Sequence, residues 1–207
     1  MRITFLFLTV CFWYFDLFAQ TNTFTGGLTL GINSAQIQGD GYGGFDKVGP
    51  ILGGFVATDV GEKWKAQLEI SYINKGSKDP PNAKINKFNF YRINLHYIEV
   101  PLVFQYPLKK IKLEVGGAYA RLFRESHSDA NGSIIPIIGP IRQGEISYVV
   151  GAAYPFGKKL WLHWRYQASL LPIASNVVFD KVRLGFFGGA YNIGVNFTLK
   201  YSLGKEE

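Results

Sequence analysis

An alternation of apolar and polar residues with a period of two recurs in seven segments of this 207-residue chain and constrains its fold more than any other feature. Residues 51–58 are apolar or glycine on both faces and are ambiguous; they are counted as an eighth strand. In residues 64–72, Trp64, Leu68 and Tyr72 share one parity, and Lys65 and Glu69 share the other. This pattern is typical of β-strands whose two faces meet different surroundings. The predicted strands are residues 28–32, 51–58, 64–72, 91–106, 111–115, 146–154, 160–166 and 191–201.

The longest predicted strand, residues 91–106, changes the parity of its apolar residues near its middle. Apolar residues occupy odd positions from Tyr91 to Tyr97 and even positions from Ile98 to Phe104. A β-bulge at the adjacent pair Tyr97 and Ile98 is the simplest explanation, because one extra residue would return all the apolar residues to one face.

The connections between the predicted strands alternate in length. Short turns are expected at residues 59–63, 107–110 and 155–158, and long connections at residues 38–47, 76–87, 124–143 and 171–185. A chain that runs up and down through a membrane in antiparallel strands has short turns on one side and long loops on the other. In an outer membrane, the short turns lie in the periplasm and the long loops lie outside the cell.

The direction of the apolar face separates two kinds of eight-stranded barrel. The interior of such a barrel has room for its own side chains or one small ligand. The bulky apolar residues of the alternation would overfill it if they faced inward. The opposite parity is rich in Gly, Ala, Ser, Thr and Asn, which suit a narrow, hydrated interior, and 16% of the chain is aromatic. We therefore predict an all-β, eight-stranded antiparallel up-and-down transmembrane β-barrel. A soluble lipocalin-like carrier, with the apolar face turned inward, is an alternative.

The first 19 residues are predicted to be a secretory signal peptide. Arg2 precedes an apolar run, residues 3–15, and the chain would be cleaved between Ala19 and Gln20. The expected organisation is a signal peptide over residues 1–19 and an outer-membrane β-barrel domain over residues 20–207. The single cysteine, Cys11, lies in the segment removed, which excludes a disulfide scaffold and a cysteine-based zinc site in the mature chain.

Four short motifs carry a resemblance to a known family. They are Gly31–Ser34, Leu68–Ser77, Tyr97–Leu102 and Gly116–Tyr119. In their order and spacing they resemble the PorT-like outer-membrane β-barrel proteins of Bacteroidota, over essentially the whole mature chain. The resemblance implies an eight-stranded outer-membrane barrel in a family in which some members are linked to a secretion pathway.

Charged residues on the polar parity are the candidate functional residues. They are predicted to form a charge network in the barrel interior, made of Lys65, Glu69, Arg92, Glu99, Lys112, Glu114 and Arg165. Unpaired charges in a narrow interior are unfavourable, so opposite charges are expected to pair and to plug the lumen. A proton or ion path is the alternative.

No catalytic, cofactor-binding or metal-binding site is predicted. The three histidines, His96, His127 and His163, are not spaced with each other or with an acid as metal ligands on one strand would be. Residues 126–129 have the residue types of a Ser-His-Asp triad, but neighbouring side chains on a strand point to opposite faces. We therefore expect no enzymatic activity.

The net charge of +7 suits a membrane interface. Lysines on the short-turn side would meet phospholipid headgroups, and basic residues on the long-loop side would lie near lipopolysaccharide phosphates; this second group is Lys47, Lys75, Lys78, Lys84, Lys87, Lys181 and Arg183. Nucleic-acid binding is not expected, because no basic face has a reading element. The expected partners are outer-membrane lipid, lipopolysaccharide and envelope proteins.

The expected function is a structural, scaffold or anchor role in the cell envelope, with a link to a secretion or envelope complex. Two alternatives remain open at this point. One is a small ligand-binding or transport barrel in the outer membrane, and the other is the soluble lipocalin-like carrier.

Overall fold

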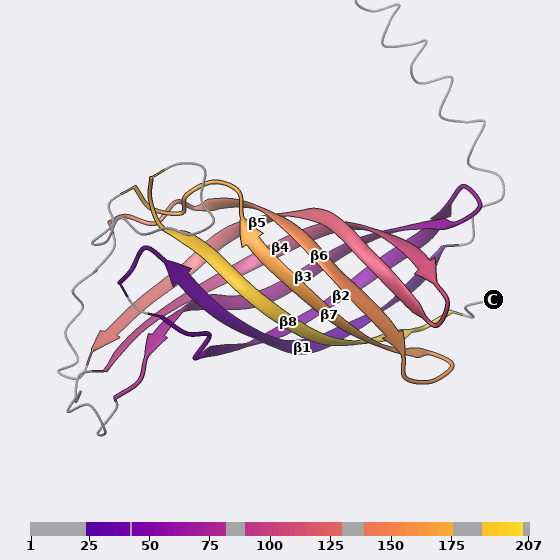
Figure 1. Ribbon diagram of the computed structural model, residues 1–207, viewed down its shortest axis with the longest axis horizontal. Coiled ribbons are helices and arrows are strands. Elements are labelled where there is room, and N and C mark those ends of the chain that lie inside the picture. The colour runs from indigo at the N-terminus through magenta and orange to yellow at the C-terminus, as the bar shows by residue number, and fades with distance from the viewer. Residues whose placement is uncertain (1–23, 42, 82–89, 130–138, 176–187, 205–207) are drawn as a thin grey trace, which may run out of the picture.

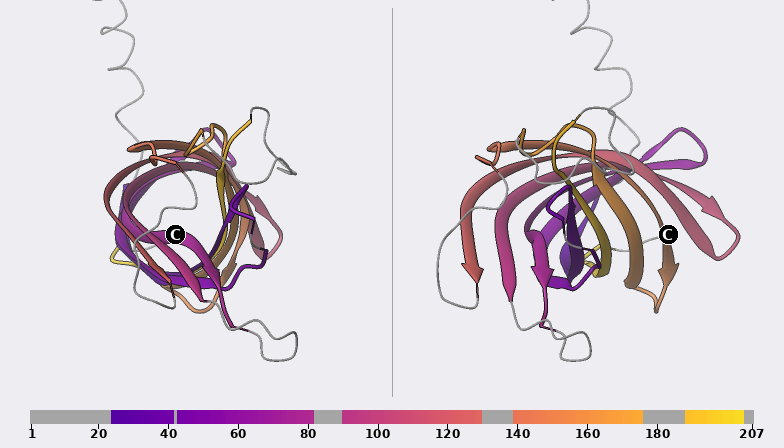
Figure 2. Two further views of the ribbon diagram at one scale, coloured as in Figure 1. Left: turned by 90° about the vertical axis from the view of Figure 1, so that its left-hand side faces the viewer. Right: turned by 60° about the vertical axis from the view of Figure 1, so that its left-hand side comes forward.

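The computed structural model describes residues 24–41, 43–81, 90–129, 139–175 and 188–204, and its strands form a closed barrel. Each strand pairs antiparallel with its neighbours in the sequence, and β8 closes the barrel on β1 (Figures 1 and 2). The strands are β1 (Thr25–Gln38), β2 (Lys47–Val60), β3 (Trp64–Asp79), β4 (Tyr91–Leu108), β5 (Ile111–Asp129), β6 (Gly144–Pro155), β7 (Leu160–Ser169) and β8 (Tyr191–Ser202). The predicted eight-stranded up-and-down barrel is confirmed.

The two ends of the barrel differ in their connections. At one end, which we call the turn end, residues 61–63, 109–110 and 156–159 join consecutive strands, and β1 starts and β8 finishes there (Figure 1, right). The opposite loop end carries the longer connections, residues 39–46, 80–90, 130–143 and 170–190. In the part of the chain that the structure describes, no helix is long and apolar enough to cross a membrane.

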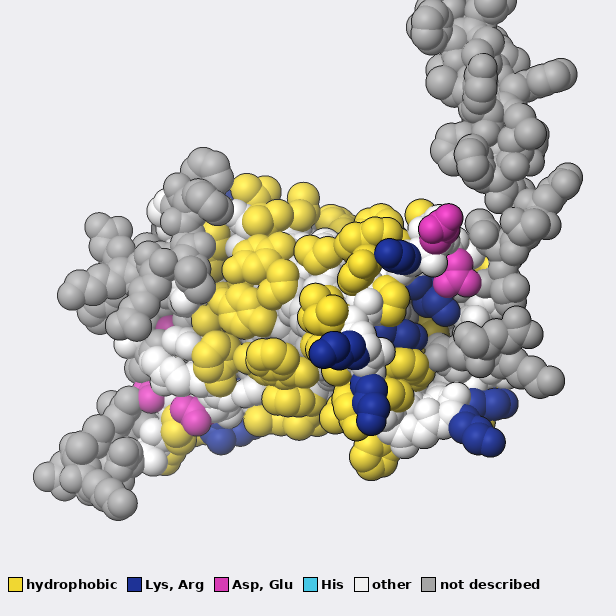
Figure 3. Space-filling view, turned by 45° about the vertical axis from the view of Figure 1, so that its right-hand side comes forward, with side chains coloured by type: hydrophobic (Ala, Val, Ile, Leu, Met, Phe, Trp, Pro, Cys, Tyr) yellow, Lys and Arg dark blue, Asp and Glu magenta, His cyan; other side chains and the backbone are white. Residues whose placement is uncertain are grey.

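Outward-facing apolar side chains form a band around the barrel (Figure 3). Leu28, Ile70 and Leu102, for example, are 60%, 61% and 45% exposed. The inward parity of the same strands is buried and polar, as at Thr29, Glu69 and Ser71. A water-soluble protein rarely exposes a contiguous apolar surface of this extent, whereas lipid covers it in a transmembrane barrel. The soluble carrier is therefore wrong for this chain.

Strand β4 does not change parity at the Tyr97–Ile98 pair. Its odd residues from Tyr91 to Gln105 are buried throughout, and its even residues from Ile98 to Phe104 are exposed. A register shift does occur beside this pair, but it lies in β5, where Phe123 is the extra residue between the partners of His96 and Tyr97. The predicted bulge within residues 91–106 is therefore wrong, as is the expectation that residues 91–97 face outward with the other apolar residues; the irregularity near Tyr97 and Ile98 belongs to the partner strand β5.

Inward-facing glycines allow the strands to coil into a narrow barrel. A Cβ atom on Gly31 would lie 2.3 Å from the carbonyl oxygen of Phe197 on β8, and one on Gly53 would lie 2.3 Å from that of Ile70 on β3. Any other residue at these two positions would push the neighbouring backbone away. The glycines thus explain why the interior charges described below lie close enough to pair.

Candidate functional site: the occluded barrel interior

Arg165 on β7 is the centre of a charge cluster in the half of the barrel nearer the turn end. Its Nη1 lies 2.7 Å from Glu69 Oε1, and its Nε and Nη2 lie 2.7 and 3.0 Å from Glu114 Oε2 and Oε1. The contact with Glu114 is a bidentate guanidinium–carboxylate pair, the strongest geometry for such an interaction. All three residues are at most 5% exposed.

Further donors complete this turn-half cluster. The buried amine of Lys200 on β8 donates to Glu69, and His163 Nδ1 lies 3.0 Å from Glu114 Oε1. Amide side chains of Gln67 and Gln105 donate to the same two carboxylates at 2.7 Å each. Two carboxylates thus meet the cations Arg165 and Lys200, so the cluster balances its charge in an interior that would otherwise disfavour it.

A second cluster lies further toward the loop end, around Lys75 on β3. Its amine lies 2.6 Å from Glu99 Oε2 and 2.8 Å from Glu145 Oε1. Gln167 donates to Glu99 at 2.7 Å, and Asn192 donates to Glu145 at 2.6 Å. We call this the mid-barrel cluster; neutral amide donors supply hydrogen bonds where one cation faces two acids.

Two small cavities remain between these side chains. One, of about 20 Å³, is lined by residues of both clusters, including Glu69, Glu99 and Arg165. The other, of about 10 Å³, lies beside Lys75 and Glu145. A volume of roughly 10–15 Å³ accommodates a single water molecule. These cavities can hold water but no larger ligand.

The interior of the loop half contains an apolar core beside buried polar side chains such as Lys47, Ser77 and Asp79. Buried side chains there form one core, made of Ile37, Ile51, Ile73, Tyr91, Ile93, Leu95, Tyr97, Ala120, Leu122, Ile173, Ala174 and Ala190. Ile173 and Ala174 come from the connection between β7 and β8, whose backbone accepts a hydrogen bond from Arg142 at 2.7 Å. The described parts of the long connections therefore fold over the barrel and contribute to its filling.

The structure brings together four of the seven charged residues predicted to lie inside. Glu69, Glu114 and Arg165 belong to the turn-half cluster, and Glu99 belongs to the mid-barrel cluster. Lys65 and Lys112 also share the inward parity, but they lie near the turn end. Lys65 is 3.6 Å from Asp59, and the amine of Lys112 lies 3.5 Å from the centre of the Trp161 ring.

The prediction for Arg92 is wrong, because this residue lies on the outward face of β4. It alternates with buried Tyr91 and Ile93, and its guanidinium lies 5.2 Å from the ring centre of Phe90. The error follows from placing a bulge in β4 itself. Without that bulge, Arg92 and Glu99 have opposite parity and face opposite sides of the sheet.

Sequence reasoning missed four titratable members of the clusters, namely Lys75, Glu145, His163 and Lys200. Lys75 was assigned to the lipopolysaccharide side, and this is wrong because its amine is buried between two acids. The inward position of Lys200 could have been predicted from the sequence, since Lys200 lies between the apolar residues Leu199 and Tyr201 of an alternating strand. Four further basic residues expected near lipopolysaccharide, Lys84, Lys87, Lys181 and Arg183, lie outside the described residues, as do Ala19 and Gln20.

The described residues include no group of three or more His, Cys, Asp or Glu side chains that could hold a metal ion. His163 is the histidine closest to acidic side chains, and its Nδ1 is already occupied by Glu114. The cluster is thus a set of mutually satisfied ion pairs in which every carboxylate has at least two donors.

The chain belongs to the outer membrane protein beta-barrel domain family, whose family model matches residues 3–197. Its fold is similar to that of Neisserial surface protein A, with 11% identity and a TM-score of 0.50 over 88% of this chain and 99% of that chain. Ail of Yersinia pestis, solved with the heparin analogue sucrose octasulfate, has 9% identity and a TM-score of 0.46 over 87% of this chain and 99% of that one. No curated protein sequence matches the chain.

The protein is therefore an outer-membrane β-barrel protein, and its location is the outer membrane. At such low identity the structural likeness shows the fold alone. The closer resemblance to PorT-like proteins and the signal peptide stay predictions.

Proposed function

We propose that this protein is a non-enzymatic barrel with a structural or anchoring role in the cell envelope. The occluded interior is the observation that carries the proposal. Two ion clusters fill the turn half and the middle, and an apolar core fills the loop half. A filled barrel offers its surroundings only its outer surface and its two ends, so its contacts are with lipid and with neighbouring envelope proteins.

Transport or ligand binding has little support in this interior. Ligand pockets measure roughly 300–1,000 Å³, whereas the cavities here measure about 20 and 10 Å³. An ion path would need mobile water between the clusters and past the apolar core, where Leu95 and Ile93 are fully buried. The same filling leaves His163 without access for a substrate, which supports the absence of catalysis inside the barrel.

The proposed orientation follows from the connections. Barrels of outer membranes have short periplasmic turns and longer external loops, and a chain delivered by a signal peptide over residues 1–19 enters the membrane from the periplasm. The loop end then faces the outside of the cell, and the turn end with both termini of the barrel faces the periplasm. Periplasmic turns or external loops would be the sites of contact with a larger complex.

Conductance of the full-length protein in planar lipid bilayers tests the proposal. The expected result is no steady channel, with a wide porin inserted into the same bilayers as a positive control. Heat-dependent gel mobility of the same preparation shows that the barrel is folded. A steady conductance from folded protein would overturn the proposal in favour of a transport barrel.

A further inference from the structure

The outward face of β3, β4 and β5 near the loop end carries a group of basic side chains. We call it the outer basic patch; its members are Lys78, Arg92, His96, Arg121 and Arg124. No Asp or Glu occupies an outward position of residues 64–79, 91–108 or 111–128 in these three strands. The outward positions of these described segments therefore supply no acid to compensate the charge of the patch.

The strand register places like charges directly opposite each other. Lys78 pairs with Arg92 across β3 and β4, and Arg124 on β5 lies opposite His96, whose Nδ1 is 2.7 Å from the hydroxyl of Tyr72. Like charges at such positions destabilise a sheet.

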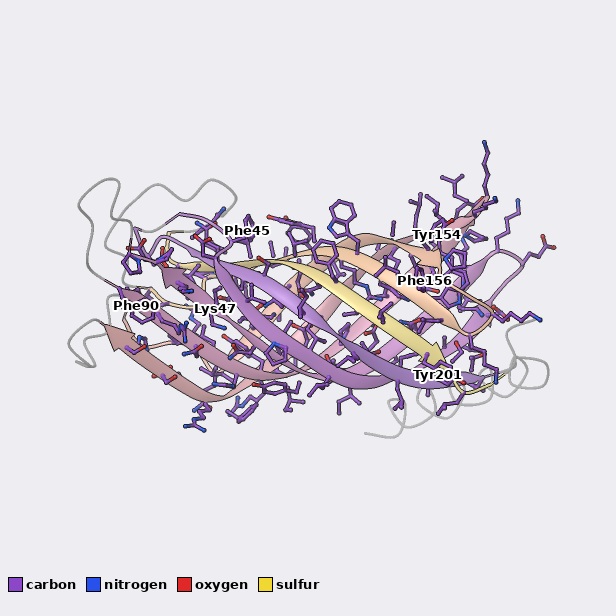
Figure 4. All side chains as sticks on the ribbon, turned by 90° about the horizontal axis from the view of Figure 1, so that it is seen from below. Phe45, Lys47, Phe90, Tyr154, Phe156 and Tyr201 are labelled. Carbon is purple, nitrogen blue, oxygen red and sulfur yellow. The ribbon has the colours of Figure 1, made fainter. Side chains whose placement is uncertain are left out.

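Arg92 also has unused hydrogen-bonding capacity. Its Nε is buried and has no hydrogen-bond partner, and its guanidinium lies beside the ring of Phe90. Figure 4 places Phe90 and Lys47 at the same end of the barrel. A phosphate beside the outward-facing guanidinium would relieve the repulsion between Arg92 and Lys78.

Three neighbouring rings indicate where the patch lies relative to the lipid. The rings of Tyr72, His96 and Phe123 have centres 6.0 to 6.2 Å apart, and the hydroxyl of Tyr72 lies 2.7 Å from His96 Nδ1. These rings lie between the apolar band, which ends at Ile70 and Ile98, and the charges of Lys78 and Arg92. Aromatic side chains of this kind collect at the boundary between hydrocarbon and headgroups.

We propose that the outer basic patch binds the phosphate groups of lipid A in the outer leaflet. Lys78, Arg92 and Arg124 meet the phosphates, and the acyl chains lie on the apolar band below, along Ile98 and Val100. The assignment rests on the proposed orientation, with the loop end outside the cell. It explains why Lys78 and Arg92 lie opposite each other with no acid at an outward position of the described strands.

Native mass spectrometry of the full-length protein in neutral detergent tests this site. The probes are bis-phosphorylated lipid A, the same lipid after removal of its phosphates, and inorganic phosphate. The triple variant Lys78→Gln, Arg92→Gln and Arg124→Gln is expected to lower the affinity for bis-phosphorylated lipid A by on the order of tenfold or more. The charge-preserving variant Lys78→Arg, Arg92→Lys and Arg124→Lys is expected to retain most of it.

A matched control removes three exposed lysines at the turn end, with Lys110→Gln, Lys158→Gln and Lys159→Gln, and is expected to leave binding unchanged. Equal affinity of the triple variant and the wild type would overturn the proposal, as would equally tight binding of dephosphorylated lipid A. If inorganic phosphate binds as tightly as lipid A, the ligand of the patch is a free anion and not a lipid. Heat-dependent gel mobility monitors folding, and the single variant Arg92→Gln decides the outcome if the triple variant does not fold.

This result is independent of the conductance experiment. Loss of lipid A binding in the variant would stand even if the wild-type barrel conducted ions. Absence of lipid A binding would leave the occluded interior and the anchoring role unaffected.

Discussion

The two halves of the barrel have opposite interiors. Near the turn end, Arg165, Glu69 and Glu114 form a buried ion cluster, and the outside is apolar. Near the loop end, the interior contains an apolar core around Leu95, and outward positions carry polar residues such as Asn94. Strand β4 passes through both regions with an unbroken alternation of inward and outward side chains.

The change between the halves falls at the adjacent apolar residues Tyr97 and Ile98. Tyr97 is fully buried inside, and Ile98 is 42% exposed outside. A transmembrane strand needs about 9–11 residues, whereas β4 has 18 and β5 has 19. The excess residues extend beyond the hydrocarbon core of the membrane, where the outward positions are polar and the interior contains a packed apolar core. The comparison shows that the surroundings of a strand decide which of its faces is apolar.

The largest effect is expected from Arg165→Met in the turn half. The variant leaves Glu114 without its bidentate partner in a buried site, and breaking a buried ion pair in this way costs about 3–5 kcal/mol of unfolding free energy. Denaturant titration of the barrel in lipid vesicles, followed by gel mobility, measures it. The double variant Arg165→Met with Glu114→Gln leaves Glu69 paired with Lys200 and is expected to be less destabilised. An equal or greater loss in the double variant would contradict the charge-balance account.

In the loop half, Leu95→Ala is expected to cost about 2–5 kcal/mol, because it opens a cavity in a packed core. Leu102→Ala, on the lipid-facing side of the same strand, is the matched control and is expected to cost less, since lipid chains can refill the space. Denaturant titration in the same vesicles measures both. Equal costs for the two variants would show that the loop-half interior is not packed as a core.

Arginine substitutions on the outward face of β4 locate the edge of the lipid. Leu102→Arg is expected to cost about 2–4 kcal/mol, as for a charge near the middle of a bilayer, and Asn94→Arg about 0–1 kcal/mol, as for a charge near its edge. Folding yield and unfolding free energy in vesicles report both values. A large loss of unfolding free energy in Asn94→Arg would place the lipid boundary on the loop side of residue 94. The two halves of the barrel would then have the same surroundings, and the comparison would fail.

The smallest effect is expected from Lys65→Gln near the turn end. Lys65 lies 3.6 Å from Asp59, and the two side chains are 22% and 58% exposed. An ion pair so accessible to solvent contributes about 0–1 kcal/mol and is screened by salt. Unfolding free energies at low and high salt should therefore differ little between Lys65→Gln and the wild type. A loss as large as that of Arg165→Met would mean that Lys65 belongs to the buried network.

Local pattern predicted the strands and the shorter turns, because lipid on one side and a narrow polar lumen on the other impose period two directly on the sequence. Glu69, Glu114 and Arg165 were predicted inside for the same reason. Glu145 and Lys75 were missed because they lie outside the predicted strands. Glu145 precedes the strand predicted to begin at residue 146, and Lys75 follows the strand predicted to end at residue 72. Arg92 was misplaced because the inversion of polarity at Tyr97 and Ile98 has the same local signature as a bulge.

The sequence by itself determined the class of this protein, an outer-membrane barrel with alternating short and long connections. Lipid on the outer face of every strand requires apolar residues at alternate positions, and this alternation is visible in the sequence. Only the tertiary structure decided which charges meet inside and where the barrel leaves the membrane. Arg165 and Glu69 are 96 residues apart in the chain, so their contact depends on strand register and barrel closure. Lys78 and Arg92 face each other for the same reason, which is that side chains on different strands meet only after the sheet has closed.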